Sequence, residues 1–335
     1  MIWFGSENDD DRYSIYCAKS RRFPGDRIAR TKRDEKGQSR AGETVDRYQY
    51  SPNLNARSLV HHRTKLIGIV TPNVSGSFHA ALISEIEKAL ESAGYAVIVS
   101  NFSGDPDQEF RTFRMMRERM TDGVILLHEN TEAELMPIRQ SFHAPIVLAS
   151  VQTESDTDYS VSIDDERAAY DAARVILENG HRRIAGVFSA SYSAGTLRKR
   201  GFRRALSEAG LEPVLEVTAS CTLAGGIEAA EAIGRSALAP TAVFFMSDEA
   251  AIGAIRKFRD LGIRVPDDLS IVSFDDIPYS DFITPRLTTV HQPIQRIGSA
   301  AAELLVRGIR GDEGMERKVY LPHSLAIRES CVRAA

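Results

Sequence analysis

The sequence predicts an α/β protein with two doubly wound, mainly parallel sheets. Its 335 residues are enough for two domains and a small additional unit, and 43% hydrophobic with 26% charged residues is typical of a globular protein. From Lys65 onward, apolar runs of strand length alternate with segments of helical periodicity. About ten such strand–helix units follow one another, enough for two sheets rather than one.

The first strand is the clearest element. Leu66–Thr71 is a continuous apolar run, as expected of a strand buried on both faces of a parallel sheet. A helix is predicted over 80–93, because its apolar residues recur on one face and Gly94 is a natural residue to end it. Asp105 and Pro106 supply an N-cap and a first-turn proline for the next helix. The other strands predicted in this half are Tyr95–Ser100, Gly123–Leu127 and Pro145–Ala149.

The same alternation resumes in the second half of the chain. In two such domains, loops from the carboxyl ends of both sheets border one cleft, where ligands bind. The sequence therefore predicts a binding cleft between two domains. The predicted strands are Ile184–Phe188, Val214–Thr218, Thr241–Phe245 and Leu269–Phe274, and the predicted helices run over Arg198–Ala209, from Gly226 onward, and over Ala250–Leu261.

Composition excludes several classes of protein. No apolar run approaches the roughly 20 residues that span a bilayer, and the N-terminus lacks the basic and apolar regions of a secretory signal. We therefore expect a cytoplasmic protein with no membrane contact. The three cysteines and eight histidines show no metal-ligand or nucleophile spacing, and there is no Gly-rich phosphate loop. The sequence thus predicts neither an enzyme nor a metal or cofactor site.

Charge is distributed unevenly along the chain. Residues 1–65 contain 14 Lys and Arg against nine Asp and Glu, a net +5, which leaves −9 on the remainder. A basic N-terminal arm on an acidic body suits a protein that binds nucleic acid at one end. A solvated tail would have the same composition, so charge alone does not decide between the two.

Five short strings stand out along the chain. They are VDRYQYSPN at 45–53, GHRRIA at 180–185, Arg198 with Gly201-Phe202, VPDDLSIVSFDD at 265–276, and PRLTTVHQP at 285–293. Each is a weak indication alone. Together and in this order they resemble the lactose/galactose repressor (LacI/GalR) family of bacterial transcriptional regulators.

The resemblance implies a type I, periplasmic-binding-protein-like fold whose chain crosses between two subdomains three times. It also implies a homodimer and a small-molecule effector, a sugar or sugar derivative, in the cleft. The implied division of the chain is a DNA-binding headpiece at 1–49, a hinge helix and linker at 50–64, an N-terminal effector subdomain at 65–164 with 292–322, and a C-terminal one at 165–291 with 323–335.

Carried over by position, Arg198 and Asp275 are the expected effector contacts. A guanidinium and a carboxylate can together orient a pair of sugar hydroxyls, although Arg198 could also be an ordinary surface residue. Asp248 follows the preceding strand, where a helix cap and an effector contact are equally good interpretations. Phe78 could stack on a sugar ring or simply pack. Weaker candidates from the same loop are Asn73 and Ser77.

Three positions of the cleft depart from the family pattern. Ala149-Ser150-Val151 stands where Asp-Arg often follows a strand, Asp165 stands where Asn is usual, and Cys221 stands where an aromatic ring often closes over the sugar. The resemblance therefore does not identify a particular sugar.

The segment before the first strand resembles the hinge of this family. Pro52 can begin a helix without losing a hydrogen bond, but the two turns that follow are too short to be stable alone. The resemblance implies that two copies order together on DNA, where Leu59 enters the minor groove. Arg57, Arg63 and Lys65 could contact phosphates there. The alternative is a surface linker with one buried leucine. The implied hinge residues are Pro52, Asn53, Ala56, Arg57 and Leu59.

The headpiece itself does not match. Gly25–Thr44 contains only three apolar residues among many charges, which cannot build the core of a helix-turn-helix. Degenerate back-translation of Ser20–Arg40, read one base later, permits AGVSPATVSRVLNE, then Met or Thr, then KKVSPE, which resembles the family's turn and recognition helix. We hypothesise a frame shift from before Ser20 to about Thr44; a divergent arm with a codon coincidence is the alternative. As written, this degenerate arm is expected to be disordered and not to read an operator.

The sequence thus predicts a sugar-responsive, DNA-binding transcriptional regulator of repressor type, with DNA reading impaired in this translation. Effector binding in the cleft would control the hinge and operator binding. The expected partners are operator DNA, the effector and a second copy of the chain. The alternative function is a cytoplasmic solute-binding sensor without DNA binding.

Overall fold

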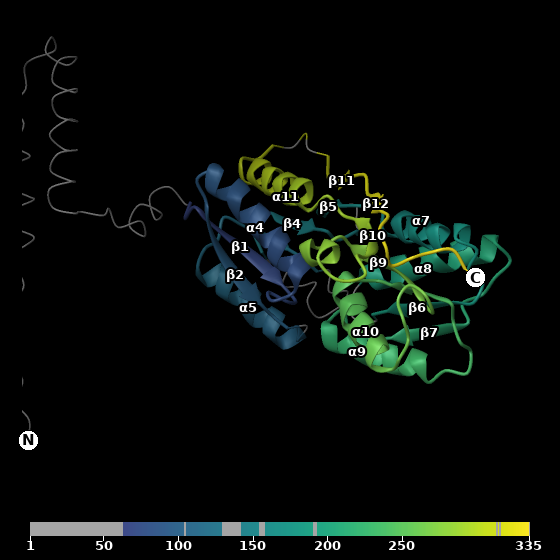
Figure 1. Ribbon diagram of the computed structural model, residues 1–335. Helices are drawn as coiled ribbons and strands as arrows, with labels where there is room; N and C mark the ends of the chain where they lie inside the picture. The colour runs from purple at the N-terminus through teal and green to yellow at the C-terminus, as the bar shows by residue number, and fades with distance from the viewer. Residues whose placement is uncertain are drawn as a thin grey trace, which may run out of the picture. The chain divides into compact units, whose positions relative to one another are not determined.

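Two sheets of six strands, mainly parallel, form the body of the protein, as predicted (Figure 1). The predicted arm at 1–49, and the hinge helix with its five predicted residues up to Leu59, lie outside the described residues. Nothing in the structure therefore tests those two predictions. The structure is a computed structural model, and it describes residues 63–103, 105–128, 142–153, 158–189, 193–312, 314 and 316–334.

The first sheet contains only parallel strand pairs, in the order β11-β5-β4-β3-β1-β2. Strand β1, which lies between β3 and β2, has the predicted bounds, and five of its six residues are buried, which explains the continuous apolar run in the sequence. The strands are β1 (Leu66–Thr71), β2 (Ala96–Asn101), β3 (Gly123–Leu126), β4 (Ile146–Ala149), β5 (Tyr159–Ser162) and β11 (Lys318–Tyr320).

The second sheet has the order β12-β10-β9-β8-β6-β7, in which only the edge strand β12 is antiparallel to its neighbour. Strands β1–β5 and β11 belong to the first sheet, and β6–β10 and β12 belong to the second. The chain therefore passes between the sheets three times, after β5, after β10 and after β11. The strands are β6 (Ile184–Phe188), β7 (Leu215–Thr218), β8 (Ala242–Phe245), β9 (Ser270–Asp275), β10 (Thr288–His291) and β12 (Ser324–Ala326).

Helices cover both sheets. Figure 1 shows α4 and α11 side by side over the first sheet, and α7 with α8 over the second. None of the helices in the described part of the chain is long and apolar enough to cross a membrane. The helices are α4 (Ser77–Ser92), α5 (Pro106–Glu118), α7 (Asp165–Glu178), α8 (Ser193–Glu208), α9 (Leu223–Gly234), α10 (Asp248–Asp260), the 3₁₀ turn η1 (Pro278–Asp281) and α11 (Ile294–Ile309).

The helix starts show which local signals were sufficient. Asp105 caps α5 as predicted, because its side chain accepts a hydrogen bond from the backbone N–H of Asp107 at 3.0 Å. By contrast, α4 begins at Ser77, three residues before the predicted start. Its N-cap, Gly76, makes no side-chain bond, so no residue in the sequence marks this start. The sequence pattern also does not single out β5, α7, β10 or α11.

Two glycines let helices approach closely. A Cβ atom on Gly201 of α8 would lie 2.0 Å from the Glu166 carbonyl oxygen of α7, and one on Gly226 of α9 would lie 1.9 Å from the Ala250 carbonyl oxygen of α10. Real Cβ atoms do not approach oxygen so closely, so only glycine permits these packings. The α7–α8 approach matters for the site described next.

Candidate ligand-binding cavity

A cavity lies where the carboxyl ends of strands from both sheets meet. Its position is the one where open α/β sheets bind ligands. Both polar and apolar side chains line it. The lining residues are Asn73, Phe78, His79, Leu127, His128, Ser150, Val151, Ser193, Ala194, Arg198, Cys221, Met246, Ser247, Glu249, Asp275 and Ile277.

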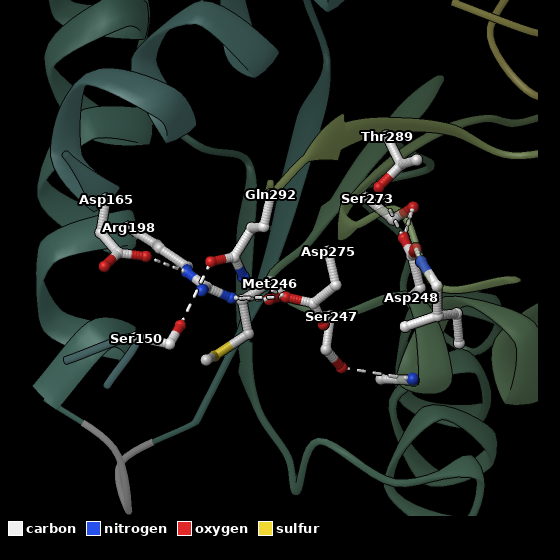
Figure 2. A network of polar contacts seen from close by, with 12 residues as sticks. Ser150, Asp165, Arg198, Met246, Ser247, Asp248, Ser273, Asp275, Thr289 and Gln292 are labelled. Carbon is white, nitrogen blue, oxygen red and sulfur yellow. Dashed lines mark hydrogen bonds and ion pairs between the residues drawn. The ribbon is translucent and has the colours of Figure 1, made fainter. Parts of the chain in front are cut away.

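Arg198 is the central cation of the cavity and is only 7% exposed. It lies three residues before Gly201 on the same face of α8, so the close approach of α8 to α7 brings it to Asp165 at the start of α7. Its Nε donates to Asp165 Oδ1 at 2.7 Å, and its Nη1 donates to the Met246 carbonyl oxygen at 2.7 Å. Figure 2 shows this arrangement. The guanidinium is therefore held rigidly at the cavity wall.

Asp275 ends β9 and faces Arg198, with 3.4 Å between Arg198 Nη1 and Asp275 Oδ1. Its backbone φ is +119°, a conformation that residues with side chains rarely adopt and that often marks functional sites. Burial raises the pKa of Asp275 to about 8, although Arg198 and the Gln292 amide favour the carboxylate. The group therefore exchanges a proton near neutral pH and can donate or accept a hydrogen bond.

Gln292 connects the two sheets beside the cavity. It lies on the crossing between β10 and α11 and is 1% exposed. Its Nε2 donates to Asp275 Oδ1 at 2.9 Å, and its Oε1 accepts from the Ser150 hydroxyl at 3.2 Å. Ser150 follows β4 with a φ of +58°. A single buried amide thus joins residues of unusual backbone conformation at the ends of both sheets (Figure 2).

Asp248 was predicted as either an effector contact or a helix cap, but it is not among the residues that line the cavity. It is fully buried, and its carboxylate accepts bonds from the hydroxyls of Ser273 at 2.5 Å, Ser280 at 2.6 Å and Thr289 at 2.6 Å. The backbone N–H of Ile277 adds a fourth bond at 3.0 Å. Figure 2 shows this network apart from Arg198. The helix cap of α10 is its neighbour Ser247, so Asp248 holds β9, β10 and η1 together.

The wall formed by the first sheet carries Phe78 and Asn73, both predicted. Phe78 lies on the first turn of α4, with its ring edge-on to His79 at 5.7 Å between centroids. The Asn73 side-chain oxygen accepts bonds from the N–H groups of Ser75 and Gly76, each at 3.1 Å, which shapes the loop between β1 and α4. The weaker candidate Ser77 begins α4 and is not among the lining residues.

Two histidines in the cavity are uncharged. Burial lowers the pKa of His79 to about 4, with further lowering by His128 and Arg198, and burial lowers the pKa of His128 to about 4. The sequence offered a signal for His128, because it lies just after Leu127, beyond the carboxyl end of β3. No local signal identified Glu249, because only the packing of α10 brings it to the cavity.

Across the described residues, no three His, Cys, Asp or Glu side chains gather as metal ligands would. The cavity instead combines one guanidinium, carboxyl groups, neutral imidazoles, hydroxyls and an aromatic ring. Such a set suits an organic ligand rich in hydrogen-bonding groups.

Comparisons with known proteins agree with this architecture. A family model for a periplasmic binding protein-like domain matches residues 173–331. The chain is 34% identical over 299 residues to catabolite control protein A of Priestia megaterium, covering 86% of this chain and 88% of that protein. It is 30% identical over 305 residues to the HTH-type transcriptional repressor PurR of Aliivibrio salmonicida, covering 89% and 90%.

Among solved structures, the chain is similar to a LacI family transcriptional regulator from Enterococcus faecium with bound ribose. The identity is 25%, the TM-score is 0.73, and the match covers 81% of this chain and all of that one. That protein carries a sugar, and its fold matches the two-sheet body described here.

Proposed function

Because the chain belongs to the lactose/galactose repressor (LacI/GalR) family, we propose that it is a sugar-responsive transcriptional regulator of repressor type. The observation that carries this proposal is the cavity at the carboxyl ends of both sheets, built around Arg198 and Asp275. An effector held between the two sheets would change their relative position, and the hinge that precedes β1 would transmit that change to DNA. Coupling of this kind is typically about 1–3 kcal/mol.

The effector contacts that we propose are Arg198, Asp275, Phe78 and Asn73. Sugar hydroxyls both donate and accept hydrogen bonds, which a guanidinium donor beside a carboxyl group satisfies. The Phe78 ring supplies an apolar surface for one face of a sugar. Gln292 and Ser150 then link the contact residue Asp275 to the other sheet.

On the DNA side, Pro52, Asn53, Ala56, Arg57 and Leu59 remain the proposed hinge residues, acting in a homodimer on an operator. The relatives named above are transcriptional regulators, which favours this function over a solute sensor without DNA binding. We further propose that the protein acts in the cytoplasm and catalyses no reaction.

Thermal unfolding with a panel of sugars tests the effector site. A sugar present at 100 times its Kd should stabilise the wild-type protein by about 2.7 kcal/mol. Arg198→Lys should weaken that binding by at least about ten-fold, because an ammonium cannot reproduce the fork that contacts Asp165 and the Met246 carbonyl. Arg200→Lys is the matched control, since Arg200 is exposed on the same helix and pairs with Glu166. An equal loss of sugar affinity in Arg198→Lys and Arg200→Lys would contradict the assignment of Arg198 as an effector contact.

Resequencing of the coding DNA across codons 10–50 tests the headpiece. A missing or extra base, with a compensating one near codon 44, would restore a helix-turn-helix and predict operator binding. An unchanged reading frame would leave a DNA-free sensor as the function of the chain as written.

A further inference from the structure

The positive charge in the cavity is already matched by the protein's own groups. Arg198 bonds to Asp165 at 2.7 Å and to the Met246 carbonyl at 2.7 Å, and Asp275 lies at 3.4 Å. Its guanidinium also stacks on the ring of Phe274, 3.6 Å from the ring centroid. A ligand anion would have to compete with the Asp165 carboxylate and the Met246 carbonyl oxygen for this one cation.

The remaining ionisable groups of the cavity include no second cation. Glu249 and Asp275 are acidic and both line it, and Asp165 lies behind Arg198. The two lining histidines add no positive charge, because burial lowers the pKa of each to about 4. Burial raises the pKa values of Glu249 and Asp275, because removal from water disfavours their charged forms.

Glu249 also occupies the place where an anion would otherwise be attracted. The N-terminus of a helix attracts anions, and α4 begins at the cavity with no side-chain cap and no acidic residue in its first turn. Glu249, in the first turn of α10, lies beside this helix start, where the Ser77 backbone N–H favours its charged form. An acidic group of the protein itself therefore stands where a ligand anion would be attracted.

We propose that the cavity selects an uncharged polyhydroxyl ligand and rejects its phosphate esters and sugar acids, with Glu249 as the specificity-determining residue. This inference rests on the sugar-binding function proposed above and narrows its ligand class. A phosphate ester carries about −1.5 to −2 charge at pH 7. Placed beside Glu249, with Arg198 already paired, it meets repulsion in a partly desolvated site that a neutral sugar does not.

The test compares matched ligand pairs by calorimetry and thermal unfolding at constant ionic strength. The pairs are D-ribose with ribose 5-phosphate, D-glucose with glucose 6-phosphate, and D-fructose with fructose 1-phosphate. Inorganic phosphate against chloride is a further arm that requires no knowledge of the natural ligand. The proteins are the wild type, Glu249→Gln, the charge-conserving Glu249→Asp, and Glu178→Gln as a control on the exposed end of α7.

For the wild type, we expect any neutral sugar that binds to do so at least about ten-fold more tightly than its phosphate ester, and we expect no stabilisation by inorganic phosphate. Glu249→Gln should reduce the preference by about five-fold or more and bind inorganic phosphate better than the wild type. Glu249→Asp and Glu178→Gln should behave as the wild type.

Two results would overturn the inference. One is a phosphate ester that binds the wild type as tightly as its neutral sugar, in which case sugar binding itself still stands. The other is a Glu249→Gln protein whose affinity for inorganic phosphate equals that of the wild type. If no sugar of either kind binds while the phosphate arm gives the expected result, the sugar-binding function fails and the charge assignment to Glu249 holds.

Discussion

The wild-type protein should lose stability as the pH rises from 5 to 8, and replacement of Asp275 by asparagine should abolish that loss. Folding raises the pKa of this carboxyl to about 8 from its ordinary 3.8, and burial is the main cause. Between these two values the folded chain therefore holds a proton that the unfolded chain has released. The free energy of unfolding must then fall as pH rises through this window. Asparagine has nearly the same shape and no titration, so Asp275→Asn should lack this fall.

The magnitude follows from proton linkage. Each unit of pKa difference corresponds to about 1.36 kcal/mol, so the Asp275 carboxyl should cost the wild type about 3–4 kcal/mol of stability between pH 5 and pH 8. The free energy of unfolding of Asp275→Asn, minus that of the wild type, should rise by about this amount over the same interval. Contributions of other titrating groups cancel in this difference.

Urea unfolding followed by circular dichroism at pH 5 and pH 8 measures both proteins. Asp268→Asn is the control, because Arg264 lowers the pKa of exposed Asp268 to about 2. The stabilisation from that pair is present above the unfolded pKa and is lost only at more acidic pH. The difference in free energy of unfolding between Asp268→Asn and the wild type should therefore be constant from pH 5 to pH 8. An Asp275→Asn difference that is equally constant would refute the argument that burial holds a proton on Asp275.

Four further substitutions test the packing and the connection between the sheets. Asp248→Ala should lower the free energy of unfolding by about 3–5 kcal/mol, because it leaves three hydroxyls and an N–H unpaired in the core; a urea midpoint close to that of the wild type would contradict the assigned network. Gly226→Ala should destabilise by about 1–3 kcal/mol or more, because its Cβ would meet a backbone carbonyl of α10. Gly234→Ala should cost much less, because its nearest neighbour is the end of a flexible side chain, and equal thermal midpoints for the two glycine variants would show that α9 can shift. Gln292→Leu should weaken sugar-induced stabilisation several-fold by removing the bonds to Asp275 and Ser150, which calorimetry would detect as a higher Kd; an unchanged Kd would assign this amide to stability alone.

Prediction from sequence placed an element correctly where the residues of that element by themselves indicate where it begins and ends. Strand β1 has the predicted bounds because burial on both faces requires a continuous apolar run. Helix α5 begins where Asp105 and Pro106 mark its first turn. The start of α4 was placed too late because its N-cap, Gly76, has no side chain that could mark a helix start. Pattern analysis of the sequence therefore had no local signal for it.

The site residues likewise include some that the sequence predicted correctly and some that it could not distinguish. Arg198 and Asp275 were identified from short strings that resemble the family, and they do line one cavity. Asp248 follows a strand in the same way as Asp275, and its sequence context does not distinguish the two. Only the fold brings the hydroxyls of Ser273 and Thr289 to Asp248, which turns a candidate contact into a buried structural carboxylate.

The sequence by itself determined the two-sheet α/β class, most strand positions, the family resemblance and the central guanidinium–carboxylate pair, because apolar periodicity and short strings are local properties. The tertiary structure alone decided which carboxyl groups face the cavity and which are hydrogen-bonded inside the core. It alone also placed Gln292 where it bonds to residues at the ends of both sheets. Those outcomes depend on contacts between residues far apart in the chain. The net charge of the cavity is the sum over groups that such contacts bring together. It is therefore determined by the tertiary fold and not by any one segment of the sequence.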